Sequence, residues 1–257
     1  MRLVDVHCHL ESDVFGDRLD SVISAAKGAG IVKLITSSIV PEEWTLSESI
    51  AGRYDEVEFA LGIHPWYGKE EDEERIADLA HAPGRGAVAI GEIGLDKKTL
   101  AIPMELQKRL FVRQLTMARE INLPVIVHCR GAFDELHVYL KKIGLPARGG
   151  VIHSYSGGVE TAVEFMKYGF SFSFGGVLTY RNSRKREAVL AAIYPDHFML
   201  ETDSPDIPPV EAGDAPNVPA NILYNLRAAA EILGESEERV AAVTTANAAR
   251  MFGFSLD

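Results

Sequence analysis

Short apolar runs alternate with longer stretches of mixed apolar and polar residues along the whole chain. Eight of these runs are almost continuous in apolar residues, which is typical of parallel strands buried on both faces. We predict strands at Leu3–Val6, Val32–Thr36, Glu58–Gly62, Ala87–Gly91, Pro124–Val127, Gly150–Ile152, Phe170–Phe174 and His197–Glu201. Strands that alternate with helices about eight times favour an α/β fold of the TIM-type (β/α)8 barrel class.

The stretches between the strands carry the start and stop signals of helices. Pro103 suits the first turn of a helix, Gly234 can end the penultimate helix, and Ser236 can cap the last one. We predict helices at Asp17–Gly28, Pro41–Arg53, Glu70–Ala80, Pro103–Ile121, Phe133–Ile143, Val159–Tyr168, Ser183–Ile193, Asn221–Leu233 and Ser236–Met251. The 257 residues match the roughly 250 residues of one such barrel. Because no linker interrupts them, we expect residues 1–257 to form a single domain.

Six potential metal ligands stand at the ends of these apolar runs, spread over most of the chain. They are His7, His9, Glu92, His128, His153 and Asp203. A closed barrel gathers its strand ends into one ring, so these side chains can meet, whereas an open doubly wound sheet would keep the first and last strands apart. Isolated histidines often pack in a core, but four imidazoles at predicted strand ends favour ligation. Together with two carboxylates they can hold two divalent ions, which predicts a hydrolase.

The charge balance limits what such a hydrolase can bind. The formal net charge is −11, and adding +4 for two divalent ions would leave −7. Long nucleic acids are usually held by a broad positive surface, so a phosphate-bearing substrate must be captured locally.

The two cysteines and the length of the apolar stretches indicate the cellular compartment. We expect Cys8 and Cys129 to be small buried residues rather than ligands, because strand alternation directs them away from the neighbouring histidines. There is no secretory signal, and no apolar stretch approaches the ~20 residues of a membrane span. We therefore expect a cytoplasmic protein with no obligate protein partner.

Seven stretches make the chain similar to the TatD family of metal-dependent hydrolases, within the amidohydrolase-like barrels. In chain order they are Asp5–His9, Gly62–Pro65, Gly91–Asp96, Leu123–Arg130, His153–Gly157, Leu200–Pro205 and Thr245–Ala248. The resemblance implies two ions with Glu92 between them. It places His7, His9 and Asp203 around the first ion and His128 and His153 around the second. It also implies phosphoester hydrolysis, most often by a deoxyribonuclease that acts from a 3′ end.

Two-metal chemistry gives these residues roles. Two ions can activate a water, polarise the phosphoryl oxygen and stabilise the leaving oxygen, and we expect Asp203 to orient that water and take its proton. Nitrogen-rich ligation favours zinc, manganese, nickel or iron, whereas the family is commonly described as magnesium-dependent. Magnesium, manganese and zinc therefore all stay open.

Three alternatives use the same residues. A carboxyl ester or amide hydrolase, such as an aminoacyl-tRNA deacylase, needs the same ions. A polymerase-and-phosphatase barrel resembling histidinol phosphatase also begins with His-x-His, but it carries further ligands that this sequence does not show. A non-catalytic metal-binding or scaffold protein would be expected to lose Asp203 or a bridging ligand, and all six ligands are present.

Five further residues are candidates for contact with the substrate. His64 follows the third strand and can hydrogen-bond a phosphate, while Trp66 can stack on a base or only anchor its loop. Arg130 can hold a phosphate in bidentate fashion or form a structural salt bridge. Ser154 and Tyr155 lie in a loop before a helix, where backbone N–H groups suit an anion.

Runs of charge stand near predicted helix starts, which lie at the catalytic end of a barrel. The basic residues are Lys97, Lys98, Arg181, Arg184, Lys185 and Arg186, and residues 70–74 are all acidic. Such runs are often only solvated faces. If they border the site, we expect a DNA 3′ end or a short phosphodiester to enter, while long duplex is repelled.

Gln107 and Gln114, on one face of a predicted helix, are expected to hydrogen-bond loop backbone.

Overall fold

Parallel pairing of neighbouring strands organises the molecule. The computed structural model describes residues 1–99, 101–180 and 183–256. The strands are β1 (Leu3–Cys8), β2 (Ile31–Ser37), β3 (Val57–Leu61), β4 (Ala89–Asp96), β5 (Val125–Arg130), β6 (Gly150–Ile152), β7 (Phe170–Phe174) and β8 (Phe198–Leu200). They form one sheet in the order β1 to β8, and each strand pairs in parallel with the next.

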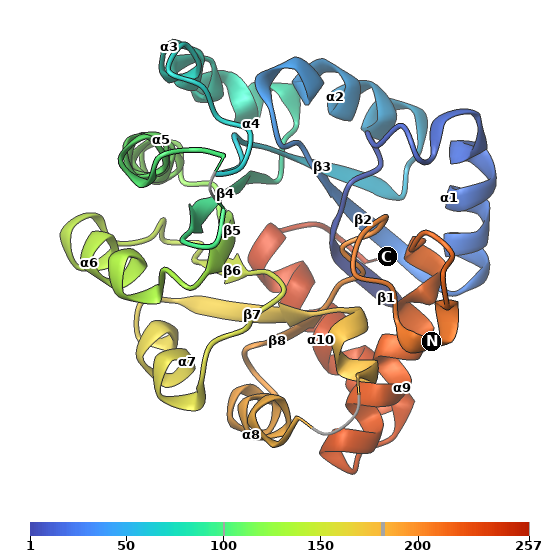
Figure 1. Cartoon of the computed structure of the whole chain (residues 1–257). Helices are drawn as coiled ribbons and strands as arrows, with labels where there is room; N and C mark the ends of the chain where they lie inside the picture. The colour runs from blue at the N-terminus through green and yellow to red at the C-terminus, as the bar shows by residue number, and fades with distance from the viewer. Residues whose placement is uncertain (100, 181–182, 257) are drawn as a thin grey trace.

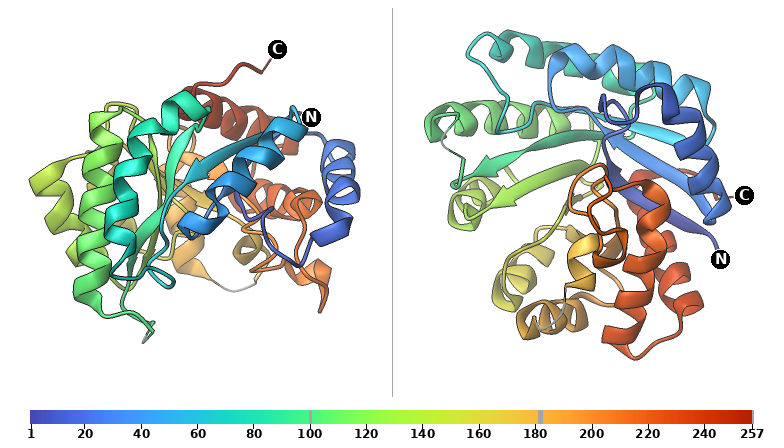
Figure 2. Two further views of the ribbon diagram at one scale, coloured as in Figure 1. Left: turned by 90° about the horizontal axis from the view of Figure 1, so that it is seen from above. Right: turned by 45° about the vertical axis from the view of Figure 1, so that its right-hand side comes forward.

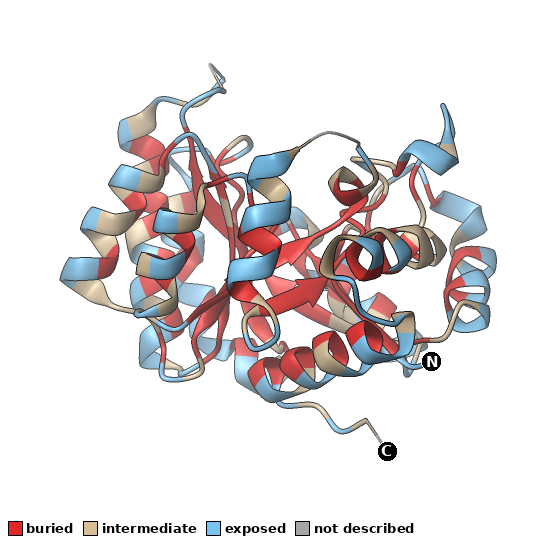
Figure 3. Ribbon diagram, turned by 90° about the horizontal axis from the view of Figure 1, so that it is seen from below, coloured by how far each residue is buried: buried red, intermediate tan, exposed pale blue. Residues whose placement is uncertain are grey.

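Helices surround the sheet (Figure 1). The α-helices are α1 (Leu19–Gly28), α2 (Trp44–Arg53), α3 (Asp72–Arg75), α4 (Ala82–Arg85), α5 (Met104–Glu120), α6 (Phe133–Ile143), α7 (Val159–Met166), α8 (Arg184–Ile193), α9 (Ile222–Leu233) and α10 (Glu237–Phe252). Short 3-10 helices are η1 (Gly16–Arg18), η2 (Pro41–Glu43), η3 (Ile76–His81), η4 (Gly176–Thr179), η5 (Val210–Ala212) and η6 (Pro219–Asn221). The strands are buried and the outer helix faces are exposed (Figure 3). No helix in the described part of the chain has the length and apolar character needed to cross a bilayer.

Hydrogen bonds from the segment after β8 bring the last strand to the first. The Asp203 N–H donates to His7 O at 2.9 Å, and the His9 N–H donates to Ser204 O at 2.8 Å. The buried Asp5 carboxylate accepts from the Thr202 N–H at 2.9 Å. The sheet therefore curls into a nearly closed barrel, and the TIM-type prediction is confirmed.

Helix α10 covers the end of the barrel at which the strands begin (Figure 2). The Thr245 hydroxyl donates to Arg2 O at 2.9 Å, and Asn247 Nδ2 donates to Phe198 O at 2.9 Å. Its apolar residues Ala248 and Met251 pack against the inward side chains of the strands. The opposite end, where the strands finish, is the mouth that carries the candidate site.

Two predicted elements differ from the structure. Strand β4 runs on to Asp96 rather than ending at Gly91, so Glu92 lies within a strand. Strands β1 and β5 also extend past their predicted ends and include His7 and His128. The apolar run ends at Glu92, but Gly94 lets the backbone continue close to β5, since a Cβ there would lie 1.9 Å from the His128 carbonyl oxygen.

The predicted continuous helix Glu70–Ala80 is also wrong, because this segment holds the single turn α3 followed by η3, and α4 begins only after them. Ile76, Leu79 and Ala82 are three residues apart and all buried. A 3-10 helix has three residues per turn and therefore aligns them on one face toward the core.

Candidate metal centre

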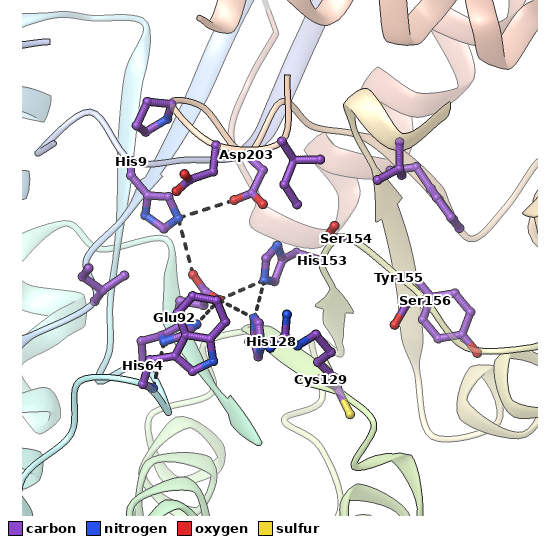
Figure 4. Close-up of a pocket in the computed structure, with 18 of the residues that line it drawn as sticks. His9, His64, Glu92, His128, Cys129, His153, Ser154, Tyr155, Ser156 and Asp203 are labelled. Carbon is purple, nitrogen blue, oxygen red and sulfur yellow. Dashed lines mark hydrogen bonds and ion pairs between the residues drawn. The ribbon is translucent and has the colours of Figure 1, made fainter. Parts of the chain in front are cut away.

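The barrel brings together all six predicted metal ligands at its mouth, although they come from distant parts of the chain. Those labelled in Figure 4 point toward one another. Strands β1, β4 and β5 carry His7, Glu92 and His128, and short segments after β1, β6 and β8 carry His9, His153 and Asp203.

Glu92 lies between two groups of imidazoles. Its Oε2 is 3.2 Å from His7 Nε2 and 3.5 Å from His9 Nε2. Its Oε1 is 3.2 Å from His128 Nδ1 and 2.9 Å from His153 Nε2. The two oxygens of one carboxylate therefore face different sets of potential ligands, which is the geometry that a bridging carboxylate requires.

Asp203 completes the group around Glu92 Oε2. Its Oδ1 is 3.3 Å from His7 Nε2 and 3.5 Å from His9 Nε2. Its backbone has φ 57, a left-handed conformation that costs energy for a residue other than glycine. The bond from its N–H to His7 O holds this conformation and keeps the carboxylate beside both β1 histidines.

The buried atoms without a hydrogen-bond partner among the described residues include His7 Nε2 and Glu92 Oε1 of the centre. His7 is 0% exposed and Glu92 is 2% exposed. A buried polar atom without a partner is costly, and a divalent cation would satisfy both atoms. Ligand atoms of His7, His9 and Glu92 all lie within 4.8 Å of one another. The residues present thus fit divalent ions, and their imidazole and carboxylate donors suit zinc or manganese.

His64 presents a protonated ring nitrogen to Glu92. Its Nε2 lies 3.0 Å from Glu92 Oε1, and its position near Glu92 and His128 would also allow ligation. However, its Nδ1 accepts the backbone N–H of Trp66 at 3.0 Å. The neutral ring must therefore carry its proton at Nε2, so His64 offers the centre a hydrogen-bond donor.

Two of the ligand histidines have the opposite arrangement. His9 Nδ1 lies 2.8 Å from Ser37 O, which can only accept, so the lone pair is at Nε2. His128 Nε2 lies 2.9 Å from Asp96 Oδ2, which leaves the lone pair at Nδ1. In both rings the nitrogen with the lone pair is the one that faces Glu92.

Electrostatics keep the two carboxylates of the centre ionised. Burial by itself would raise the pKa of Glu92, but the surrounding imidazoles, first among them His64, hold it well below its usual value. Burial also opposes ionisation of Asp203, but the neighbouring side chains of His7 and His9 hold its pKa below the usual range. Burial lowers the pKa of His153 to about 4, so this ring is neutral, as ligation requires.

Two buried acids behind the ligands were not predicted as functional residues. Asp96 accepts from His128, from Trp66 Nε1 at 2.7 Å and from Arg130 Nε at 3.0 Å. The Oε2 atom of Glu201 lies 4.0 Å from His153 Nδ1. The available signal was an acid at the end of an apolar run, because a buried carboxylate needs a partner.

The predicted substrate residues line one cavity of about 1000 Å³ beside the centre. The Arg130 guanidinium lies 5.3 Å from the centroid of the Trp66 ring. Arg130 also pairs with Asp96, so the structural salt bridge that the sequence left open is present.

The backbone N–H groups of Ser154 and Tyr155 are not open to an anion in this structure. Their N–H groups already donate to Glu201 Oε1 at 2.8 Å and to Ser173 O at 3.2 Å. The Tyr155 hydroxyl donates to Gly158 O at 2.9 Å, so this side chain forms a wall of the cavity rather than a polar contact for the substrate.

The acidic run 70–74 is also placed differently from the prediction. Arg109 pairs with Glu70 and Glu73, and Arg113 pairs with Glu73. None of residues 70–74 lines the cavity, whereas Lys185 and Arg186 do. Arg181 lies outside the described residues.

Other expectations are confirmed. Gln114 Oε1 accepts the N–H of Ile63 and Gln107 Oε1 accepts that of Asp96, both at 2.8 Å, so the two glutamines support the segments that carry His64 and Asp96. Cys8 and Cys129 are buried and free, and the Cys129 sulfur points away from the histidines (Figure 4).

Comparison with known proteins identifies the family. Residues 4–253 match the sequence model of a family described as TatD related DNase. The chain belongs to the TatD family. It is 34% identical over 251 residues to YabD of Bacillus subtilis, named an uncharacterized metal-dependent hydrolase, with 97% of this chain and 98% of the relative covered. It is 31% identical over 257 residues to a protein of Cronobacter sakazakii named 3′-5′ ssDNA/RNA exonuclease TatD, with 97% of each chain covered.

A solved structure agrees with this assignment to the TatD family. The crystal structure of YjjV, a TatD homologue from Escherichia coli, has a TM-score of 0.92 at 30% identity, and 99% of each chain is covered. The chain is therefore a metal-dependent hydrolase of the TatD family with a TIM barrel fold.

Proposed function

We propose that this TatD-family hydrolase removes nucleotides from the 3′ end of single-stranded DNA by hydrolysing phosphodiester bonds with two divalent metal ions. The observation that carries the proposal is Glu92, whose two oxygens face separate groups of imidazoles. The name of the Cronobacter sakazakii relative supports the substrate and the polarity. The cavity of about 1000 Å³ beside Glu92 can enclose a nucleotide.

Each ion would be held by one group of side chains around Glu92. The group at Oε2 is His7, His9 and Asp203, and the group at Oε1 is His128 and His153. When bound, two divalent ions make a water nucleophilic at neutral pH and stabilise the charge on the phosphate oxygens.

The residues of the chain position the substrate and move the proton. Asp203 is ionised and lines the cavity, and it accepts the proton of the attacking water at its carboxylate. His64 Nε2–H, fixed as a donor by Trp66 N–H, donates to a phosphoryl oxygen. The Trp66 ring offers a face for the terminal base, and Arg130, whose side chain is 49% exposed, offers its guanidinium to a phosphate.

Turnover of end-labelled DNA tests this function. Purified protein supplied with manganese, magnesium or zinc should shorten 5′-labelled single-stranded DNA stepwise and release 5′-mononucleotides. Asp203→Asn should reduce the rate by about 10²- to 10⁴-fold, the usual contribution of a general base. Asp214→Asn, an exposed carboxylate outside the cavity, should keep the wild-type rate. Shortening that survives in Asp203→Asn, or turnover of a carboxyl ester such as p-nitrophenyl acetate in place of DNA, would contradict the proposal.

A further inference from the structure

The cavity beside the metal centre has walls of opposite charge. Its acidic wall consists of Glu11, Asp13, Glu43 and Asp206, on segments that follow β1, β2 and β8. Its basic wall consists of Arg130, Lys185 and Arg186, on β5 and α8. The acidic segments are neighbours because β8 closes onto β1, whereas Arg130 on β5 lies half the ring away from β1. Helix α8 lies between β7 and β8, and Lys185 on this helix reaches the segment after β6, where its Nζ donates to Ser156 O at 2.7 Å. Arg130 and Lys185 thus lie on a different side of the metal centre from the acidic wall.

The acidic wall is not neutralised by nearby cations. No lysine or arginine among the described residues forms an ion pair with any of its four carboxylates, whereas two residues of the acidic run 70–74, Glu70 and Glu73, pair with Arg109 and Arg113. Glu11 instead accepts hydrogen bonds from the hydroxyls of Thr36 and Ser47, and Glu43 accepts the N–H of Ile39 at 2.9 Å. A negative field therefore acts on whatever occupies this side of the cavity.

The negative charge of the acidic wall acts on groups beside the metal centre. Partial burial raises the pKa of Asp206, and the charge of Asp203 raises it further. Tyr67 lines the same cavity, and its pKa is raised by burial and then by the charges of Asp206, Glu92 and Glu43. Glu92 also lines this cavity, so the acidic wall and the metal centre border the same space.

We propose that the acidic wall makes this site select strand ends that carry a free 3′-hydroxyl. The inference rests on the proposed function. With the scissile phosphate at Glu92, a further phosphate on the 3′ side would meet carboxylates that have no cationic partner. The phosphates on the 5′ side would meet Arg130 and Lys185. The preferred ligand class is a terminal nucleoside 5′-phosphate, and nucleoside 3′,5′-bisphosphates and 3′-phosphorylated ends are rejected.

Neutral variants of the acidic wall isolate its charge. The test protein carries Asp13→Asn, Glu43→Gln and Asp206→Asn, which keep the side-chain shape and remove three charges. Glu11 is left in place because it is buried and binds Thr36 and Ser47. The matched control carries Glu120→Gln, Asp214→Asn and Glu235→Gln, three exposed positions outside the cavity, so the net charge of the two proteins is the same.

Equilibrium binding measures the selection without turnover. Calorimetry on the manganese-loaded proteins compares thymidine 5′-monophosphate with thymidine 3′,5′-bisphosphate. In the test protein the affinity for the bisphosphate relative to the monophosphate should rise about tenfold, since three repulsive charges are removed. The control protein should keep the wild-type ratio. Added salt should also raise the wild-type ratio, because it screens the exposed part of the wall.

Turnover provides the second readout. The kcat/KM of a 3′-phosphorylated oligonucleotide relative to its 3′-hydroxyl form should rise in the test protein by a similar factor, about tenfold. An unchanged binding ratio in the test protein would overturn the inference, even if 3′-hydroxyl DNA is digested. A shifted binding ratio in a protein that digests no phosphodiester would overturn the proposed function and leave the role of the wall supported.

Discussion

The two halves of the metal centre are held in different ways. On the β1 side, Ser37 is the partner of both histidines: its hydroxyl lies 3.1 Å from His7 Nδ1 and its carbonyl oxygen 2.8 Å from His9 Nδ1. On the β5 side, His128 is held by the Asp96 carboxylate, which also binds Trp66 and Arg130. The β1 half is thus supported by neutral groups of one strand. In the β5 half, Asp96 links His128 to Trp66 and Arg130, which line the cavity.

This difference indicates that the β5 half has two tasks. An ionised partner makes an imidazole a stronger ligand and fixes its orientation. Burial would lower the pKa of His128, but the hydrogen bonds to Asp96 and Glu92 raise it to about 9. Because Asp96 also positions Trp66 and Arg130, a change at Asp96 should alter both metal binding and substrate binding, and a change at Ser37 should alter metal binding alone.

The largest expected effect comes from Glu92, which belongs to both halves. Glu92→Gln removes the charge that faces both groups of imidazoles, so both ions should be lost and the rate should fall by about 10³-fold or more. Metal content by mass spectrometry and the rate on 3′-hydroxyl DNA check this. Glu120→Gln, an exposed substitution, is the control. Retention of both ions in Glu92→Gln would show that Glu92 does not bridge the halves.

Asp96→Asn should affect the β5 half alone. We expect metal affinity to fall by about 10- to 100-fold at one of two sites, as for other partners of ligand histidines. KM for DNA should rise as well, because Trp66 and Arg130 lose a shared acceptor. Titration with manganese, followed by electron paramagnetic resonance, measures the two sites separately. Equal weakening of both sites would contradict the division into halves.

Gln107→Leu should disturb the β5 half, because Gln107 holds the backbone of Asp96. Gln107 accepts the Asp96 N–H at 2.8 Å and donates to Asp96 O at 3.1 Å, and both groups are buried. Their loss should lower the free energy of unfolding by about 1–3 kcal/mol in urea titrations. Gln114→Leu, which removes the equivalent bonds to Ile63, should cost a similar amount of stability. Only Gln107→Leu should weaken manganese binding. Weaker manganese binding in Gln114→Leu than in Gln107→Leu would contradict this prediction.

The smallest effect is expected from Ser37→Ala in the β1 half. It removes the hydroxyl beside His7 Nδ1 but keeps the carbonyl oxygen that binds His9. One lost neutral hydrogen bond contributes about 1 kcal/mol, so affinity at the β1 site should fall by about fivefold with no change in KM for DNA. An effect as large as that of Asp96→Asn would remove the distinction between neutral and ionised partners.

The convergence of the candidate ligands could be predicted from the sequence, but the contacts of the groups behind them could not. His7, His128 and Asp203 stand where apolar runs end, and parallel strands bring such ends together. Asp96 and Glu201 also end apolar runs, but their contacts depend on how β4, β5 and β8 pack, which no local pattern shows. The acidic wall could not be predicted for the same reason, since Glu11, Glu43 and Asp206 meet only in the folded barrel, whereas residues 70–74 form a local run.

Anomalous diffraction from a crystal of the manganese-loaded protein would show whether Glu92 bridges two ions. We predict two anomalous peaks that share Glu92, one bound through Oε2 with His7, His9 and Asp203, and the other through Oε1 with His128 and His153. His64 should lie beside the second ion as a donor and not as a ligand. A single peak, or two peaks that do not share Glu92, would contradict the account.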